Sequence, residues 1–226
     1  MKEVGYQRRF EIRIYFVFGL FLLVVGFLIG WLHPARVSQQ IGPALKQLAQ
    51  TMEHNGAQLP WPHEWLLLLL HNAGTATELA LFGLAFGIFP AYSMWMNGLV
   101  SGYAVSLVVQ AKGVPAWKPI VFGLLPHGIF ELTAILWAAA LGIGNGMALF
   151  RAIGHAFRSE TPTRTADGQR KNTGESFRDA HPLRFSLLRT ARSLPIIWGM
   201  LVIAATIESA ITPHLIAWGI PNLQSH

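Results

Sequence analysis

Long apolar runs are the feature that most restricts the fold of this chain. The run from Ile14 to Leu32 contains 19 residues without a charged side chain, and about 20 apolar residues are enough for a helix to cross a bilayer. Comparable runs cover roughly 65–110, 120–150 and 194–220. A span in hydrocarbon has to satisfy its own backbone hydrogen bonds, so these runs predict transmembrane helices.

The composition agrees with a membrane protein. Hydrophobic residues make up 52% of the 226 residues and charged residues only 12%, against about 25% charged residues in soluble domains. The chain has no cysteine, which excludes disulfides and thiolate chemistry. It also contains no G-x-S-x-G, P-loop or G-x-G-x-x-G motif, so the sequence does not support a serine hydrolase or a nucleotide-binding protein.

The N-terminal run is predicted to be an uncleaved first transmembrane helix. Residues 1–13 carry four basic side chains, which would also suit a signal peptide. The apolar core of a signal peptide, however, normally has about 7–15 residues and is followed by a small-residue cleavage site. Here the run is longer and ends in Trp31-Leu32-His33-Pro34, which favours a permanent membrane helix.

Residues 33–63 are predicted to form a polar extracytoplasmic connection that contains an amphipathic helix. Apolar residues recur in it every three or four positions, at Val37, Ile41, Leu45, Leu48 and Met52. This spacing puts them on one face of a helix that lies on the membrane surface or on the other helices.

The two longest apolar runs each exceed one crossing. We expect the first to break near Pro90, into a second helix at about 65–88 and a third at about 91–110. The run from Ile120 to Phe150 has two interpretations. A short re-entrant or interfacial helix at about 119–125 precedes a fourth helix that starts at Pro126, a favoured first-turn residue. Alternatively, one long tilted helix carries a proline kink.

These boundaries predict an all-α, polytopic integral membrane protein with five transmembrane helices. Helices one to four lie within 14–150, the basic segment 151–193 forms a loop, and 194–226 holds the fifth helix and a tail. With 1–13 and 151–193 in the cytoplasm, 13 of the 17 Lys and Arg residues lie inside, in line with the positive-inside rule. We expect a protein of the cell (inner) membrane with its N-terminus in the cytoplasm and its C-terminus outside. The basic loop lacks aromatic interleaving, so no nucleic-acid partner is expected.

Polar residues within the spans form narrow faces on four of the predicted helices. At 100° per residue, each face combines small or hydroxyl residues with one to three ionisable or amide groups. We expect these faces to pack against each other, because small residues allow close approach and polar groups need partners in hydrocarbon. The ionisable and amide residues on these faces are His71 and Glu78 on the second helix, Asn97 on the third, His127, Glu131 and Asn145 on the fourth, and Glu208 on the fifth.

Glu78, Glu131 and Glu208 are the three acids that fall in predicted spans, and no Lys or Arg lies deep in any span to neutralise them. A charged group in hydrocarbon is expensive. Two interpretations stay open: a neutral carboxyl group hydrogen-bonded to His71, His127 or the backbone, and a polar cavity that binds a cation or relays protons. A zinc site needs three or four convergent ligands, for which His127, Glu131, Glu208 and His71 are the candidates, although the HExxH motif of metalloproteases is absent.

GxxxG spacings favour close helix packing within the chain over a dimer face. Examples are Gly83/Gly87, Gly98/Gly102 and Gly142/Gly146.

A block at the start of the predicted fourth helix carries a resemblance to a known family. The block is Pro126-His127-Gly128-Ile129-Phe130-Glu131-Leu132, and further matches are Asn72, Asn97-Gly98 and Ala204-Ala205-Thr206-Ile207-Glu208. From about Ile14 to Pro213 the chain is similar to the stage II sporulation protein M family. The resemblance implies a membrane scaffold that, in spore formers, works with peptidoglycan-degrading partners during engulfment. The segment 159–182 is longer than the family's usual fourth connection.

The leading hypothesis is a non-enzymatic membrane scaffold or assembly factor that works with a membrane-protein partner or a second copy of the chain. In it, His127, Glu131, Glu208, Asn72 and Asn97 stabilise the bundle through buried hydrogen bonds. The alternative is a cation- or proton-coupled transporter or channel-like protein, and the third hypothesis is an intramembrane metal-dependent hydrolase. The sequence requires no cofactor, and a cation is the one ligand that these side chains suggest.

Overall fold

The computed structural model describes residues 2–43, 61–83, 87–158 and 182–220, and all regular structure within them is helical. Four helical segments are long and apolar enough to cross a membrane, namely Ile12–Leu32, Trp61–Phe82, Pro119–Gly154 and Leu183–Ala210. The expectation of an all-α, multi-pass membrane protein in contact with the bilayer is therefore confirmed, with four spans. The predicted third helix is long enough, but its polar residues keep it out of this set.

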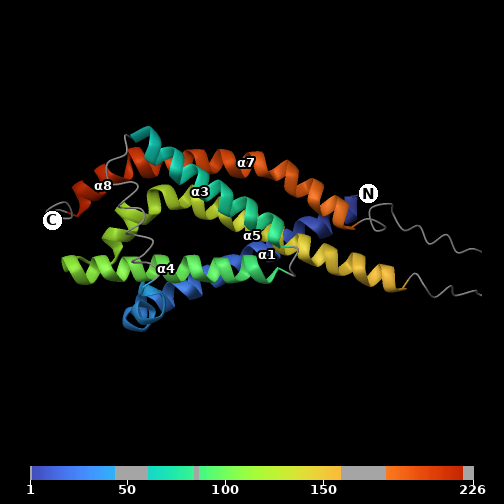
Figure 1. Cartoon of the computed structure of the whole chain (residues 1–226), viewed down its shortest axis with the longest axis horizontal. Helices are drawn as coiled ribbons and strands as arrows, with labels where there is room; N and C mark the ends of the chain where they lie inside the picture. Colours follow the sequence, from blue (N-terminus) through green and yellow to red (C-terminus); the bar gives the residue numbers. More distant parts are fainter. Residues whose placement is uncertain (1, 44–60, 84–86, 159–181, 221–226) are drawn as a thin grey trace, which may run out of the picture.

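The helices run along the longest axis of the molecule, with the start of α1 at one end and α8 at the other (Figure 1). A further helical stretch covers residues 34–43. The elements are α1 (Lys2–Leu32), α3 (Trp61–Phe82), α4 (Ile88–Lys112), the π-helix η1 (Pro119–Leu124), α5 (Leu125–Arg158), α7 (Pro182–Ala210) and α8 (Thr212–Gly219).

The break between α3 and α4 comes before Pro90, not at it. Gly87 precedes α4 with a φ of 73°, in the left-handed region that residues other than glycine rarely adopt. Pro90 is the third residue of α4, where its missing N–H costs no intrahelical hydrogen bond. The glycine therefore breaks the helix, and the proline starts the next one.

A short helical segment does precede the fourth long helix. It is η1, which runs directly into α5 at Leu125, so the two interpretations of this run merge into one continuous 36-residue span, Pro119–Gly154.

The predicted fifth helix, at 194–220, differs more from the structure. The helical region begins earlier, at Pro182, and is divided into α7 and α8, with Pro213 in the first turn of α8. An interior proline removes one helix hydrogen bond and clashes with the preceding turn, so it kinks or breaks a helix. The helix breaks next to Pro213, whereas α7 continues through Pro195.

Two predicted segments lie mainly outside the described residues. In the amphipathic helix of 33–63, the described part is helical at 34–43, and Val37 packs against Leu99 and Tyr103 of α4. Leu45, Leu48 and Met52 fall outside the described residues, as does the segment 159–181 of the long loop.

Helices α1 and α4 pack at backbone contact and run in the same direction. A Cβ at Gly26 or Gly30 of α1 would collide with the main chain of α4 at Trp95 and Leu99. A Cβ at Gly98 or Gly102 of α4 would collide with the main chain of α1 at Leu23 and Phe27. The GxxxG pair Gly98/Gly102 therefore packs within the chain.

The core lies between α3, α5 and α7 and combines alanines with larger apolar residues. Ala76 and Ala80 of α3 and Ala134 and Ala138 of α5 are fully buried, as is Leu201 of α7. Many other large apolar side chains lie on the outer surfaces, among them Phe21, Leu70, Phe82, Ile196 and Val202. This distribution is the one that a helix bundle in lipid requires, because small residues let the backbones approach and lipid tails solvate the large ones.

The prediction that His71 and Glu78 of the second helix face the other helices is wrong. In α3 the side chains of His71 and Glu78 are exposed, while the buried residues are Asn72, Ala76, Leu79 and Ala80. The alanines allow α3 to lie close to its neighbours, and their packing determines the rotation of the helix. The polar face that His71 and Glu78 share consequently turns outward.

Candidate functional site

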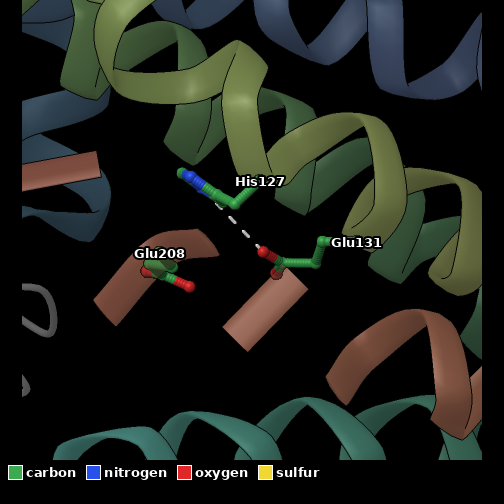
Figure 2. A group of neighbouring side chains, drawn as sticks. All are labelled: His127, Glu131 and Glu208. Atoms are coloured by element: carbon green, nitrogen blue, oxygen red, sulfur yellow. Dashed lines mark ion pairs between the residues drawn. The ribbon is translucent and has the colours of Figure 1, made fainter. Parts of the chain in front are cut away.

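A group of one histidine and two glutamates lies between α5 and α7. One ligand atom from each of His127, Glu131 and Glu208 lies within 4.8 Å of the others, and Figure 2 shows the three side chains in the space between the two helices. We call this group the His-Glu-Glu cluster. It lies near the start of α5 and the end of α7, at the end of the bundle that also holds α8 (Figure 1).

The helix packing explains why these side chains meet. His127 and Glu131 are four residues apart on α5, so they share a face. The same face continues into Ala134 and Ala138, which are fully buried in the core. On α7 the buried positions Leu201, Ala204 and Ala205 continue in the same way to Glu208. The cluster is the polar end of an otherwise apolar contact between the two helices.

The contact between His127 and Glu131 is longer than a hydrogen bond. His127 Nε2 lies 4.0 Å from Glu131 Oε2, whereas a hydrogen bond between these atoms needs about 2.7–3.2 Å. Thr212 Oγ1, at the start of α8, lies 3.5 Å from His127 Nδ1. The side chains of His127 and Glu131 are 14% and 21% exposed. The cluster is thus a partly accessible site in which His127 and Glu131 lie at ion-pair distance, without a direct hydrogen bond between them.

A cavity of about 410 Å³ adjoins the cluster. It lies between α4, η1, α5, α7 and α8, and most of its lining is aliphatic. Four polar side chains reach it: His127, Glu208, Ser101 of α4 and Thr212 of α8. The cavity is large enough for several water molecules, since each needs about 30 Å³.

The structure does not bring the other predicted site residues to this group. His71 and Glu78 lie on the outer face of α3, and Asn72 is buried in the same helix. Asn97 is half-buried in α4, where its Nδ2 donates to the Ser93 carbonyl oxygen 2.9 Å away. An amide that bonds its own preceding turn is satisfied locally and is not available to link helices.

A second polar group links three helices around Asn145. Its Nδ2 donates to the Ala80 carbonyl oxygen of α3 at 2.9 Å and to Thr190 Oγ1 of α7 at 3.0 Å. Ser186 Oγ of α7 donates to Asn145 Oδ1 at 2.6 Å. Asn145 lies on the predicted polar face of its helix, but Ser186 and Thr190 fall in the segment predicted as a loop. The spacing of four residues between Ser186 and Thr190, which is that of one helix face, is the sequence signal that could have identified them.

All three cluster residues lie in the stretches that carry the family resemblance: His127 and Glu131 belong to Pro126–Leu132, and Glu208 ends the stretch that begins at Ala204. Residues 17–213 match the stage II sporulation protein M family. The chain belongs to this family. The match covers both helices that hold the cluster, together with α3, α4 and the second half of α1. No curated protein and no solved structure matches the chain.

An imidazole and two carboxylates are a chemically suitable set of ligands for a transition metal in this family member. Zinc binds histidine nitrogen and glutamate oxygen at about 2.0–2.2 Å, so the ligand atoms of a tetrahedral site lie about 3.4 Å apart. Separations of up to 4.8 Å are about 1.4 Å wider than this. Rotation of the two flexible glutamate side chains covers such a difference. Two ionised carboxylates this close also repel each other, so a cation or a shared proton lowers the energy of the group.

Proposed function

We propose that this stage II sporulation protein M family member is a non-enzymatic membrane scaffold whose helices α5 and α7 are joined by a cation at the His-Glu-Glu cluster. The observation that carries the proposal is the convergence of three ligand atoms from two helices within 4.8 Å. A divalent metal of the zinc class, held by His127, Glu131 and Glu208, fits this ligand set.

The packing of the bundle supports a scaffold. The cluster joins α5 to α7 at one end, and Asn145 joins the same helices to α3 toward the other. Two tryptophan hydrogen bonds add to the α3–α7 contact: Trp65 Nε1 donates to Thr206 Oγ1 and Trp198 Nε1 donates to Thr77 Oγ1. A framework held at both ends suits a protein that presents a fixed surface to others.

We further propose that α4 is a fifth crossing. It has 25 residues, about 37 Å of helix, against a hydrocarbon core of about 30 Å. Its parallel, glycine-mediated contact with the span of α1 supports this assignment. Five crossings with 13 of 17 Lys and Arg residues inside give a cytoplasmic N-terminus and an extracytoplasmic C-terminus in the cell membrane. In this orientation the cluster lies toward the extracytoplasmic side.

A scaffold needs a partner, and we propose a membrane protein or a second copy of the chain. The outward position of His71 and Glu78 in a candidate span supports this. Ionisable side chains in contact with lipid are expensive, so residues of this kind are expected to meet another protein.

The decisive experiment measures metal binding by the purified full chain. Wild type, Glu131→Gln, Glu208→Gln and His127→Asn are loaded with zinc, dialysed and assayed for bound metal and unfolding temperature. We expect about one ion per chain in wild type, a higher unfolding temperature with zinc, and loss of both effects in the three variants. Glu78→Gln is the matched control, since Glu78 lies on the outer face of α3 and should leave zinc binding unchanged. Absence of zinc from wild-type protein prepared with the metal in excess would refute the cation site.

The cavity beside the cluster favours one alternative, a cation- or proton-coupled transporter. It places His127 and Glu208 on the wall of a space of about 410 Å³, next to the π-helical turns of η1. Non-regular helices beside a polar site are a feature of transporters. Flux into proteoliposomes distinguishes the two functions: a scaffold gives none, and a transporter gives a flux that Glu131→Gln abolishes. Equal flux with wild type and Glu131→Gln would exclude transport through this site.

A further inference from the structure

A second cavity lies on the other side of the bundle's midpoint, away from the His-Glu-Glu cluster. It has a volume of about 520 Å³ and lies between α1, α5 and α7. Two arginines line it, Arg13 of α1 and Arg189 of α7, and none of its other lining residues within the described part of the chain is acidic. Arg13 is the second residue of the span Ile12–Leu32, and Arg189 is in the second turn of the span Leu183–Ala210. The cavity is therefore near one edge of the membrane layer.

The surrounding residues hold the guanidinium of Arg189 in the contact between three helices. Its Nη2 lies 3.5 Å from Ser186 Oγ, and Ser186 in turn donates to the buried Asn145. Opposite it on α5 is Gly144, where a Cβ would lie 3.2 Å from Arg189 Nη2 and 3.8 Å from the ring of Tyr15. The lack of a side chain at position 144 thus leaves room for the guanidinium.

The remaining walls of the cavity are apolar. Phe16 and Val17 of α1 and Trp137 of α5 line it, and Ser193 of α7 adds one hydroxyl. Guanidinium groups bind phosphate oxygens through paired hydrogen bonds, and basic pockets between transmembrane helices are suited to anionic lipid headgroups. A small free anion would pair with the arginines but would leave the aromatic walls without a partner. A phospholipid satisfies both, through its phosphate and its acyl chains.

We propose that the cavity binds an anionic phospholipid, with its phosphate between Arg13 and Arg189 and its acyl chains along Phe16 and Trp137. The lipid would contact all three helices and stabilise their association. This site is separate from the His-Glu-Glu cluster and does not depend on the function proposed for it.

The test measures lipid-dependent unfolding of the purified full chain in neutral detergent. Phosphatidylglycerol, phosphatidylcholine and inorganic phosphate are titrated separately, and the unfolding temperature is recorded. We expect phosphatidylglycerol to raise it with saturation, and phosphatidylcholine and inorganic phosphate to have little effect. Arg13→Gln should weaken the phosphatidylglycerol response by about fivefold in apparent affinity, the worth of one arginine near an anionic surface. A response to inorganic phosphate equal to that with phosphatidylglycerol would overturn the assignment to a lipid.

Arg192→Gln is the matched control, because Arg192 is exposed on α7 and does not line the cavity. It removes the same charge and should leave the response to phosphatidylglycerol unchanged. Arg189→Gln also removes a contact with Ser186, so its response is compared with its own unfolding temperature without lipid. If Arg13→Gln and Arg189→Gln both respond as wild type does, the two arginines do not form a lipid site.

Discussion

Replacing Gly98 by alanine tests whether α4 lies at backbone contact with α1. A Cβ at this position would collide with the carbonyl oxygen of Leu23, and it would also meet the main chain at Phe27. These are backbone atoms of a helix, which cannot rotate away as a flexible side chain would. The two helices therefore have to separate before the methyl group fits.

Two opposing effects determine the size of the change. Alanine is favoured over glycine in a helix by about 1 kcal/mol. Inserting a methyl group into a well-packed contact costs typically about 1–3 kcal/mol, and the rigid backbone on the other side puts this case near the upper end. Packing therefore outweighs helix propensity, and we expect Gly98→Ala to lower the free energy of unfolding by about 1–2 kcal/mol.

Reversible unfolding in mixed micelles titrated with a denaturing detergent measures this difference. Gly199→Ala is the matched control, because Gly199 lies within α7 and, among the described residues, no other helix has an atom within 4 Å of the added Cβ. Because the added methyl group meets no neighbouring helix, only the higher helix propensity of alanine acts, and Gly199→Ala should be neutral or stabilising by up to about 1 kcal/mol. If Gly98→Ala is as stable as Gly199→Ala, the close pairing of α1 with α4 is refuted.

Two further predictions concern the Asn145 network and the number of crossings. Asn145→Ala removes hydrogen bonds to α3 and α7. Each such bond within a membrane contributes about 0.6 kcal/mol or more, so the free energy of unfolding should fall by about 2 kcal/mol. The control is Asn97→Ala, which removes a bond local to α4, and an Asn145→Ala change no larger than the control's would contradict this. The chain has no cysteine, so single cysteines at the exposed positions Gln40, Ala111 and Arg184 report topology without background. With five crossings, a membrane-impermeant maleimide should label Gln40→Cys and Ala111→Cys on intact cells and Arg184→Cys only after permeabilisation. Labelling of Ala111→Cys only after permeabilisation would remove α4 from the crossings.

Much of the architecture can be derived from the chain alone. Apolar runs of membrane length predict spans because the hydrocarbon core sets one minimum length for every helix, and four helices of the described residues are long and apolar enough to cross a membrane. Helix boundaries were harder to predict, as the break at Gly87 and the early start of α7 at Pro182 illustrate. Polar side chains such as Ser186 and Arg184 make the start of α7 resemble a loop in sequence. Packing against α5 nevertheless stabilises it as a helix.

The sequence by itself determined the family, the helical class and the presence of His127, Glu131 and Glu208 on polar faces of apolar helices. Only the tertiary structure decided which of these faces meet. Helical periodicity fixes how side chains are arranged around one helix, but not the rotation of that helix in the bundle. In α3 the alanines face inward, and His71 and Glu78 are left outside. In α5 and α7 the small residues and the acids share one face, so the packing that buries Ala134 and Ala205 also brings Glu131 close to Glu208.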